Sequence, residues 1–146
     1  MFEHILMPVD KATLAPTFYH QLEHMFRGMH PKITLVHISD PMPPMFYSDA
    51  IMGANYQSQK EHLKAVNAYA EHVFTSIKQQ LSSQFTTDTL HILDEDTANG
   101  ILTAIKKSKA DLVLMTPHRD AGFMDRLIGT KTYSVMMRTK VPVLAI

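Results

Sequence analysis

Two adjacent residues near the C-terminus could hold a phosphate group. Gly129 and Thr130 stand at the start of an expected helix over residues 130–138. A glycine there lets the backbone approach an anion, and the unpaired N–H groups of a helix start point toward it. The Thr130 hydroxyl offers one more donor. An ordinary glycine turn with Thr130 as the helix N-cap is the alternative, and these two residues do not decide between them.

Two further segments follow expected strands. Pro8, Val9 and Asp10 end the first strand, and residues 115–119 (Met-Thr-Pro-His-Arg) follow the fourth. Ligands of open parallel sheets bind beyond the carboxyl ends of the strands, where the order of the chain reverses. If the first and fourth strands are neighbours, both segments converge with Gly129. The Asp10 carboxylate has an alternative role as the cap of a turn or helix.

Five short apolar runs predict the strands that must position these segments. They cover residues 4–9, 33–38, 89–93, 111–115 and 141–146. The runs are mostly apolar rather than strictly alternating, which is typical of parallel strands covered on both faces.

Helical patterns lie between these strands. Thr97 is a candidate N-cap for a helix that includes Ile101 and Ile105, and a short helix over 130–138 precedes the last strand. Steps of three and four residues predict one apolar helix face with Leu14, Phe18, Leu22, Met25 and Met29 and another with Leu63, Val66, Ala70, Val73, Ile77 and Leu81.

The alternation of strands and helices predicts a single α/β domain over residues 1–146. We expect one open, five-stranded parallel sheet of Rossmann-like type, with strand order 3-2-1-4-5, right-handed crossovers and helices on both faces. The proline- and methionine-rich stretch from Pro41 to about Tyr56 is longer than most connections. It predicts either a binding segment or a loop that only covers the sheet edge.

Several segments together resemble the universal stress protein (UspA-like) family. They are residues 5–10 (Ile-Leu-Met-Pro-Val-Asp), 110–119, 127–130 and 141–144 (Val-Pro-Val-Leu). Taken with the order of elements, the resemblance covers essentially the whole chain. It implies the fold of the adenine nucleotide alpha hydrolases and a regulator that binds an adenine nucleotide.

The resemblance also implies a set of nucleotide contacts. The family's ATP-binding pattern is Gly, two residues, Gly, nine residues, Gly and then Ser or Thr. Its spacing is kept here, but Thr116 and Arg119 replace the first two glycines, in a His-Arg variant of the motif. The expected nucleotide-binding residues are Pro8, Val9, Asp10, Val36, Met115, Thr116, His118, Arg119, Gly129, Thr130, Lys131 and Thr132.

The expected ligand is ATP or AMP, with Mg²⁺ accompanying a triphosphate and Asp10 as the nearest carboxylate. The charges are divided unevenly. Residues 1–96 hold six basic and eleven acidic side chains, whereas residues 97–146 hold eight and three, net charges of −5 and +5. A basic C-terminal third suits an anionic ligand, although Lys106, Lys107 and Lys109 also fit an ordinary solvated helix face.

Other classes of function lack their sequence signals. No basic stripe predicts nucleic-acid binding, no apolar run approaches the roughly 20 residues of a membrane helix, and no signal peptide is recognisable. We therefore expect a cytoplasmic protein. His20 and His24 lie four apart but lack the glutamate and third ligand of a zinc site. No Walker lysine, Gly-x-Ser-x-Gly or cysteine nucleophile is present, so the sequence predicts slow ATP hydrolysis at most.

Three functions remain open. The first is an ATP- or AMP-binding stress-response regulator that acts as a homodimer through the edge strand over residues 141–146. The second is a dimeric stress or scaffold protein of the same fold that binds no nucleotide. The third is an adenylyl transferase or ligase, whose His-x-x-His and Lys-Met-Ser-Lys-Ser motifs are both missing from the sequence.

Overall fold

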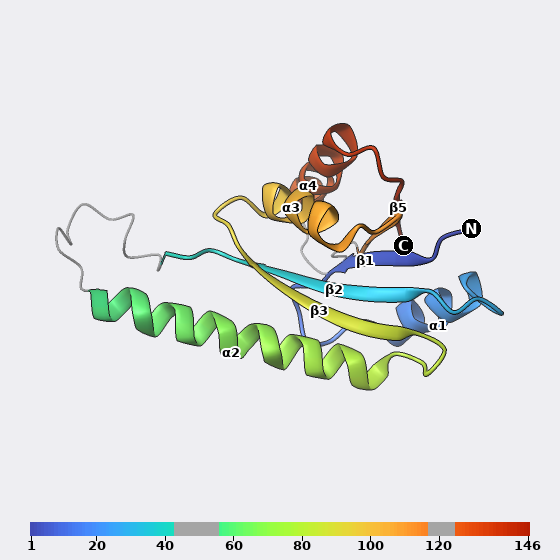
Figure 1. Cartoon of the computed structure of the whole chain (residues 1–146), viewed down its shortest axis with the longest axis horizontal. Helices are drawn as coiled ribbons and strands as arrows, with labels where there is room; N and C mark the ends of the chain where they lie inside the picture. Colours follow the sequence, from blue (N-terminus) through green and yellow to red (C-terminus); the bar gives the residue numbers. More distant parts are fainter. Residues whose placement is uncertain (43–55, 117–124) are drawn as a thin grey trace.

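A computed structural model describes residues 1–42, 56–116 and 125–146, with the backbone alone described at 56–58 and 125–130. Strands and helices alternate along the chain, as the sequence predicts (Figure 1). The elements are β1 (His4–Pro8), α1 (Pro16–Met25), β2 (Lys32–Ser39), α2 (Tyr56–Gln80), β3 (Thr86–Leu93), α3 (Thr97–Ser108), β4 (Leu112–Met115), α4 (Asp125–Arg138) and β5 (Val143–Ala145).

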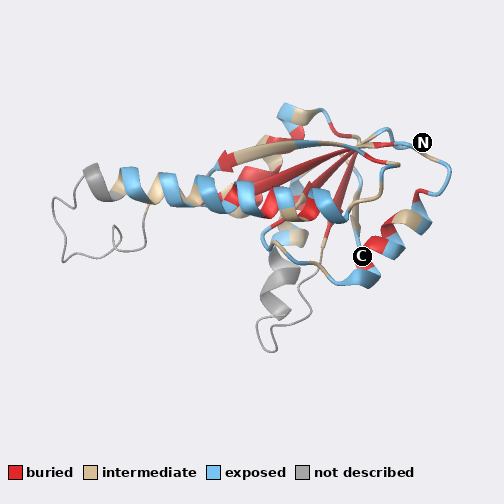
Figure 2. Ribbon diagram, turned by 90° about the horizontal axis from the view of Figure 1, so that it is seen from below, coloured by how far each residue is buried: buried red, intermediate tan, exposed pale blue. Residues whose placement is uncertain are grey.

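The strands form one parallel sheet in the order β3-β2-β1-β4-β5, which confirms the predicted topology. Figure 1 shows α1 and α2 on one side of the sheet and α3 and α4 on the other. β1 lies in the centre, paired with β2 from His4 opposite Lys32 to Pro8 opposite Val36. A parallel sheet with both faces covered buries its central strands, which appear red in Figure 2.

Successive strand residues enter two separate cores. Ile5 and Met7 of β1 pack in a cluster with residues of α1 and α2, whereas Leu6 packs with residues of α3 and α4. β4 repeats the alternation, with Leu114 in the first cluster and Val113 in the second. Side chains of a strand point to opposite faces in turn, so an apolar run without alternation supplies both cores.

The strand boundaries differ from the prediction by one to three residues. β3 starts at Thr86 rather than Thr89, because the polar residues at its start pair with β2 although they add little to the core. β5 covers only Val143–Ala145, within the predicted 141–146. A backbone ladder does not require apolar side chains, so hydrophobicity alone misplaces strand ends.

The first helix is shorter than its apolar pattern suggests. α1 covers Pro16–Met25, so Leu14 precedes it and Met29 follows it, although both pack against the core.

The cap of α3 also differs from the prediction. Asp96, not Thr97, is the N-cap, and its carboxylate accepts the N–H of Asn99 at 3.2 Å. Aspartate and threonine are both good caps, so the pattern could not place the helix start to within one residue.

Asp111 ties the start of β4 to the start of β1. Its carboxylate accepts the backbone N–H of Glu3 at 2.9 Å and that of His4 at 3.0 Å. Burial tends to raise the pKa of Asp111, but these backbone donors outweigh it and lower the pKa below the usual value.

In the described ranges, no helix is long and apolar enough to cross a membrane.

Gly100 allows α3 to lie close to β2. A Cβ atom at Gly100 would lie 2.6 Å from Ile38 Cγ2 and 2.9 Å from its Cδ1.

We expect Gly100→Leu to lower the free energy of unfolding by about 1–3 kcal/mol, since overpacking must displace Ile38 or the helix. Lys107→Leu, at an exposed position of the same helix, is the control and should change it by less than about 0.5 kcal/mol. Urea denaturation measures both, and equal stability of the two variants would contradict the close packing.

The His4 side chain should make stability depend on pH. Burial, followed by the charge of Lys32, lowers its pKa below 6.5 despite the opposing charges of Asp111 and Asp88. The unfolded chain therefore binds the proton more readily, so this contribution is complete above about pH 6.5 and is lost as the pH falls through the folded pKa. In His4→Gln, the fall in unfolding free energy between pH 7 and 5 should be smaller than in the unaltered protein. An unchanged slope would refute this, and His20→Gln, on an exposed part of α1, is the control.

Candidate functional site

The carboxyl ends of β1 and β4 meet at one edge of the sheet. β1 and β4 pair directly, with Ile5 opposite Leu112 and Leu6 opposite Val113. From β1 the chain moves outward in one direction through β2 and β3, and then returns to add β4 and β5 on the other side. Doubly wound sheets bind their ligands at such a reversal, beyond the carboxyl ends of the strands. The prediction that β1 and β4 are neighbours is therefore confirmed, and residues 117–119 lie outside the described residues.

The end of β1 is held firmly while Asp10 reaches the surface. The Val9 N–H donates to the Val36 carbonyl at 2.8 Å, and His37 Nδ1–H donates to the Val9 carbonyl at 2.7 Å. Pro8 is half-buried, Val9 is buried and Asp10 is exposed. A carboxylate at this position can accept hydrogen bonds from hydroxyl or amino groups of a ligand.

The family resemblance implies nucleotide contacts from backbone groups near Val36 on β2, and this stays a prediction. The Val36 side chain is fully buried in the cluster beneath α3, and the Val36 carbonyl already accepts the Val9 N–H. Ile38 lies two residues nearer the carboxyl edge on the same face of β2 and is half-buried. Side chains alternate between the two faces of a strand, so Val36 and Ile38 lie on the same face. Which of the two lies nearer a ligand depends on where β2 ends.

The end of β4 brings Thr116 to the same edge. Met115 is buried against α3 and α4, its carbonyl accepts the Ile146 N–H at 3.2 Å, and half-buried Thr116 follows. His118 and Arg119, also expected to contact nucleotide, lie outside the described residues.

The predicted helix start at Gly129 and Thr130 is wrong, while a role of these two residues in nucleotide binding stays a prediction. α4 begins at Asp125, so both residues lie inside the helix rather than at its first position. Only the first N–H groups of a helix lack an intrahelical acceptor, and within α4 these belong to residues 125–127. An interior glycine costs a helix about 1 kcal/mol, which the flanking residues can offset. Lys131 is exposed and Thr132 half-buried on the following turn.

A polar cluster under α2 was not recognised from the sequence. His37 on β2 and His91 on β3 are register neighbours with ring centroids 5.9 Å apart, and the Tyr69 ring meets His37 edge-on at 5.5 Å. Ser39 Oγ is hydrogen-bonded to His91 Nε2 at 2.8 Å. Burial lowers the pKa of His91, the neighbouring His37 lowers it further, and Glu71 opposes the shift. The sequence offered one signal for this cluster, which is a histidine within each of the apolar strand segments 33–38 and 89–93.

The described residues offer binding groups rather than a metal centre. No group of three or more histidine, cysteine or acidic side chains within residues 1–42, 56–116 and 125–146 could hold a metal ion. At the β1–β4 edge, the structure provides a carboxylate, a hydroxyl and fixed backbone groups. These can bind a polar ligand through hydrogen bonds.

Comparisons with solved structures agree with this fold. The hypothetical protein MJ0577 superposes with a TM-score of 0.76 at 18% identity, over 100% of this chain and 96% of that one. A universal stress protein in complex with cAMP gives 0.62 at 12% identity, over 99% and 96% of the chains. An Arabidopsis thaliana universal stress protein family member with AMP bound gives 0.61 at 13%, over 99% and 90%.

The sequence comparisons give one negative and one positive result. No curated protein matches this chain. The model of the universal stress protein family matches residues 1–146, the full length of the sequence. With the five-stranded parallel sheet in the order 3-2-1-4-5, this match shows that the chain belongs to the universal stress protein family.

Proposed function

We propose that this protein is an adenine-nucleotide-binding regulator of the stress response. The observation that carries the proposal is the direct pairing of β1 with β4, because Asp10 and Thr116 then follow neighbouring strands at the same edge of the sheet. Two solved structures of the same fold contain cAMP and AMP. An adenine nucleotide is therefore the ligand class that agrees with both the position and the polar groups of this site.

The nucleoside part of the ligand belongs beside β1. Asp10 is exposed directly after a strand end whose N–H and carbonyl are both engaged, so its carboxylate stands on a rigid support. Ribose hydroxyls and the adenine amino group are donors that a carboxylate accepts. Thr116 faces the same edge from β4 and supplies a hydroxyl.

The phosphates belong nearer to α4. Because this helix starts at Asp125, we place the anion near the N–H groups of residues 125–127 rather than at Gly129. Arg119 and Lys131 supply positive charge along the same part of the sequence. If the ligand is ATP rather than AMP, Mg²⁺ accompanies it through the phosphate oxygens, as is usual for this cation.

We assign a binding role in the cytoplasm rather than rapid catalysis, with slow ATP hydrolysis as the upper limit.

The alternative is a dimeric scaffold that binds no nucleotide, and one observation favours it. Thr116 has a β-carbon where the family pattern has glycine, and it is half-buried at the strand end. Nucleotide binding by the unaltered protein separates the two.

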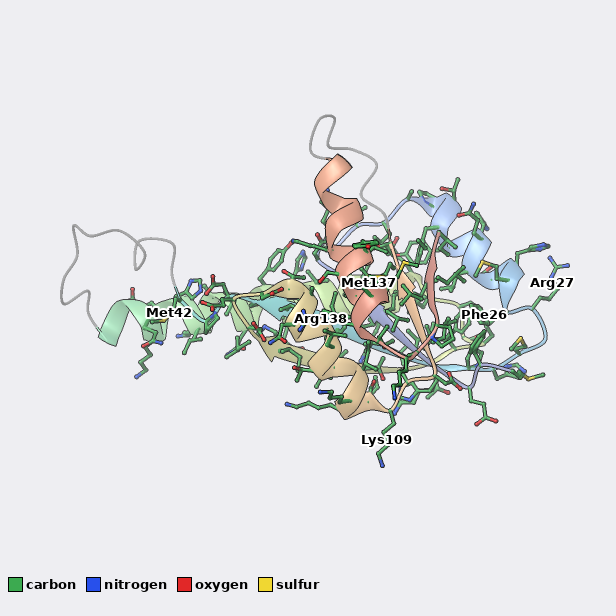
Figure 3. The ribbon with its side chains drawn as sticks, turned by 90° about the horizontal axis from the view of Figure 1, so that it is seen from above. Phe26, Arg27, Met42, Lys109, Met137 and Arg138 are labelled. Carbon is green, nitrogen blue, oxygen red and sulfur yellow. The ribbon has the colours of Figure 1, made fainter. Side chains whose placement is uncertain are left out.

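We further propose that two copies associate through β5. This strand is at the sheet edge, and residues 141–146 carry no charged side chain to discourage pairing. On α4, Tyr133, Met136 and Met137 are 63%, 52% and 68% exposed, spaced as neighbours on one side of the helix. Figure 3 labels Met137 and Arg138 in its last turn. Apolar side chains this exposed suit a second copy of the same surface.

Calorimetry with AMP and with MgATP tests the nucleotide proposal. We expect binding by the unaltered protein, and Arg119→Ala should lose about 1.5–3 kcal/mol of binding free energy because a charge-assisted contact to phosphate is removed. Arg27→Ala is the matched control, since Arg27 is an exposed arginine following α1. No heat of binding with either nucleotide at millimolar concentration would overturn the proposal and favour the scaffold.

Light scattering tests the dimer. Val143 and Leu144 pack partly against the chain's own cores, so an acidic residue there would also disturb the monomer. Ala145 is exposed, and Ala145→Asp would place like charges together across the two-fold axis. We expect a dimer mass for the unaltered protein at micromolar concentration and a shift toward monomer for Ala145→Asp, but not for the distant Lys107→Asp. A monomer mass for the unaltered protein would refute the proposal.

A further inference from the structure

The segment between β1 and α1 is held by side chains from distant parts of the chain. Residues 9–15 belong to no helix or strand, so their backbone carbonyls need other partners. His37 Nδ1–H donates to the Val9 carbonyl at 2.7 Å, Tyr69 Oη–H to the Asp10 carbonyl at 2.8 Å, and Ser76 Oγ–H to the Ala12 carbonyl at 2.6 Å.

These donors come from β2 and from α2, the helix that covers the sheet face on which His37 lies. His37 is buried on β2 beneath α2 and contacts the Tyr69 ring. Tyr69 and Ser76 are seven residues apart on α2, which is two helical turns, so they lie on one side of the helix. Val73 lies between them and is fully buried in the core. The packed helix thus presents its two hydroxyls along the β1–α1 segment.

The geometry points to His37, Tyr69 and Ser76 as positioning residues for the ligand site, and we propose that they hold Asp10 in its nucleotide-binding position. This inference rests on the proposed function, because it assumes that Asp10 contacts the ligand. None of the three side chains needs to touch nucleotide. They act on the backbone, where a displacement of Val9 or Ala12 would move the Asp10 carboxylate away from ribose or adenine.

The hydrogen bonds of His37 and Tyr69 differ in how deeply the donor side chain is buried. His37 is 6% exposed and its bond to Val9 closes the end of β1, whereas Tyr69 is 46% exposed and acts one residue further out. A hydrogen bond reachable by water contributes less to overall stability than a buried one. Removal of the Tyr69 hydroxyl should therefore loosen the segment without unfolding the protein.

Two substitutions test the inference. Tyr69→Phe and Ser76→Ala each remove one hydroxyl and keep the helix. We expect each to weaken AMP binding about fivefold, the effect of losing one ordinary hydrogen bond. Amide hydrogen exchange of residues 10–14 without nucleotide should rise by a similar factor, while exchange within β1 and β2 stays the same. Ser76→Thr keeps a hydroxyl and should restore affinity.

Two control variants separate positioning from general stability. Ser108→Ala removes a serine whose Oγ–H also donates to a carbonyl, that of Ile105, but on α3. Val73→Ala opens a cavity in α2 between the two donors and should lower Tm more than Tyr69→Phe does. Neither should change AMP affinity or exchange at residues 10–14, measured well below Tm.

The possible failures are distinguishable. If the unaltered protein binds AMP and the Tyr69→Phe and Ser76→Ala variants bind it equally well, the positioning role is overturned while the proposed function stands. The same follows if Val73→Ala weakens binding as much as they do, because loss of stability then explains the effect. If the unaltered protein binds no AMP, the proposed function fails, and with it the role of these residues in binding; altered exchange would then show only a structural clamp.

Discussion

The pairing of β1 with strands on both sides is the constraint on which the rest of the structure depends. β2 and β4 each form a parallel ladder with β1, although they follow it by about 25 and 105 residues in the sequence. Asp111 strengthens the second ladder by accepting two backbone N–H groups at the start of β1. Because both neighbours run parallel to β1, all three carboxyl ends reach the same edge, so the position of the proposed ligand site follows from the topology rather than from any one motif.

Much of this arrangement could be predicted from the sequence, because it depends on patterns of apolar residues. Buried strands such as residues 33–38 are recognisable without knowledge of their partners, and the order of elements then limits the topology to few choices. Element ends were less predictable. α4 starts at Asp125, so Gly129 is not at the helix start where its residue type had suggested a phosphate seat.

The polar contacts around the site could not be predicted in this way. His37, Tyr69 and Ser76 are bonded to carbonyls that lie 28, 59 and 64 residues away in the sequence. No local pattern marks a side chain whose partner is a backbone group of a distant loop. Histidine in an apolar strand signals a buried polar group that requires a partner, but not which partner, since that depends on how α2 packs on the sheet.

These two kinds of constraint explain why the fold of this chain is also found in MJ0577, at only 18% sequence identity. The fold requires only that strand residues be apolar and of suitable volume, so many sequences satisfy it. The site requires backbone groups at the ends of β1 and β4 in particular positions, and different side chains can hold a backbone equally well. A threonine in place of glycine at position 116 therefore changes the shape available to a ligand without disturbing β4, whose last residue, Met115, is buried and bonded to residue 146. The apolar side chains that build the fold and the backbone groups that would face a ligand are therefore different atoms of the same strands.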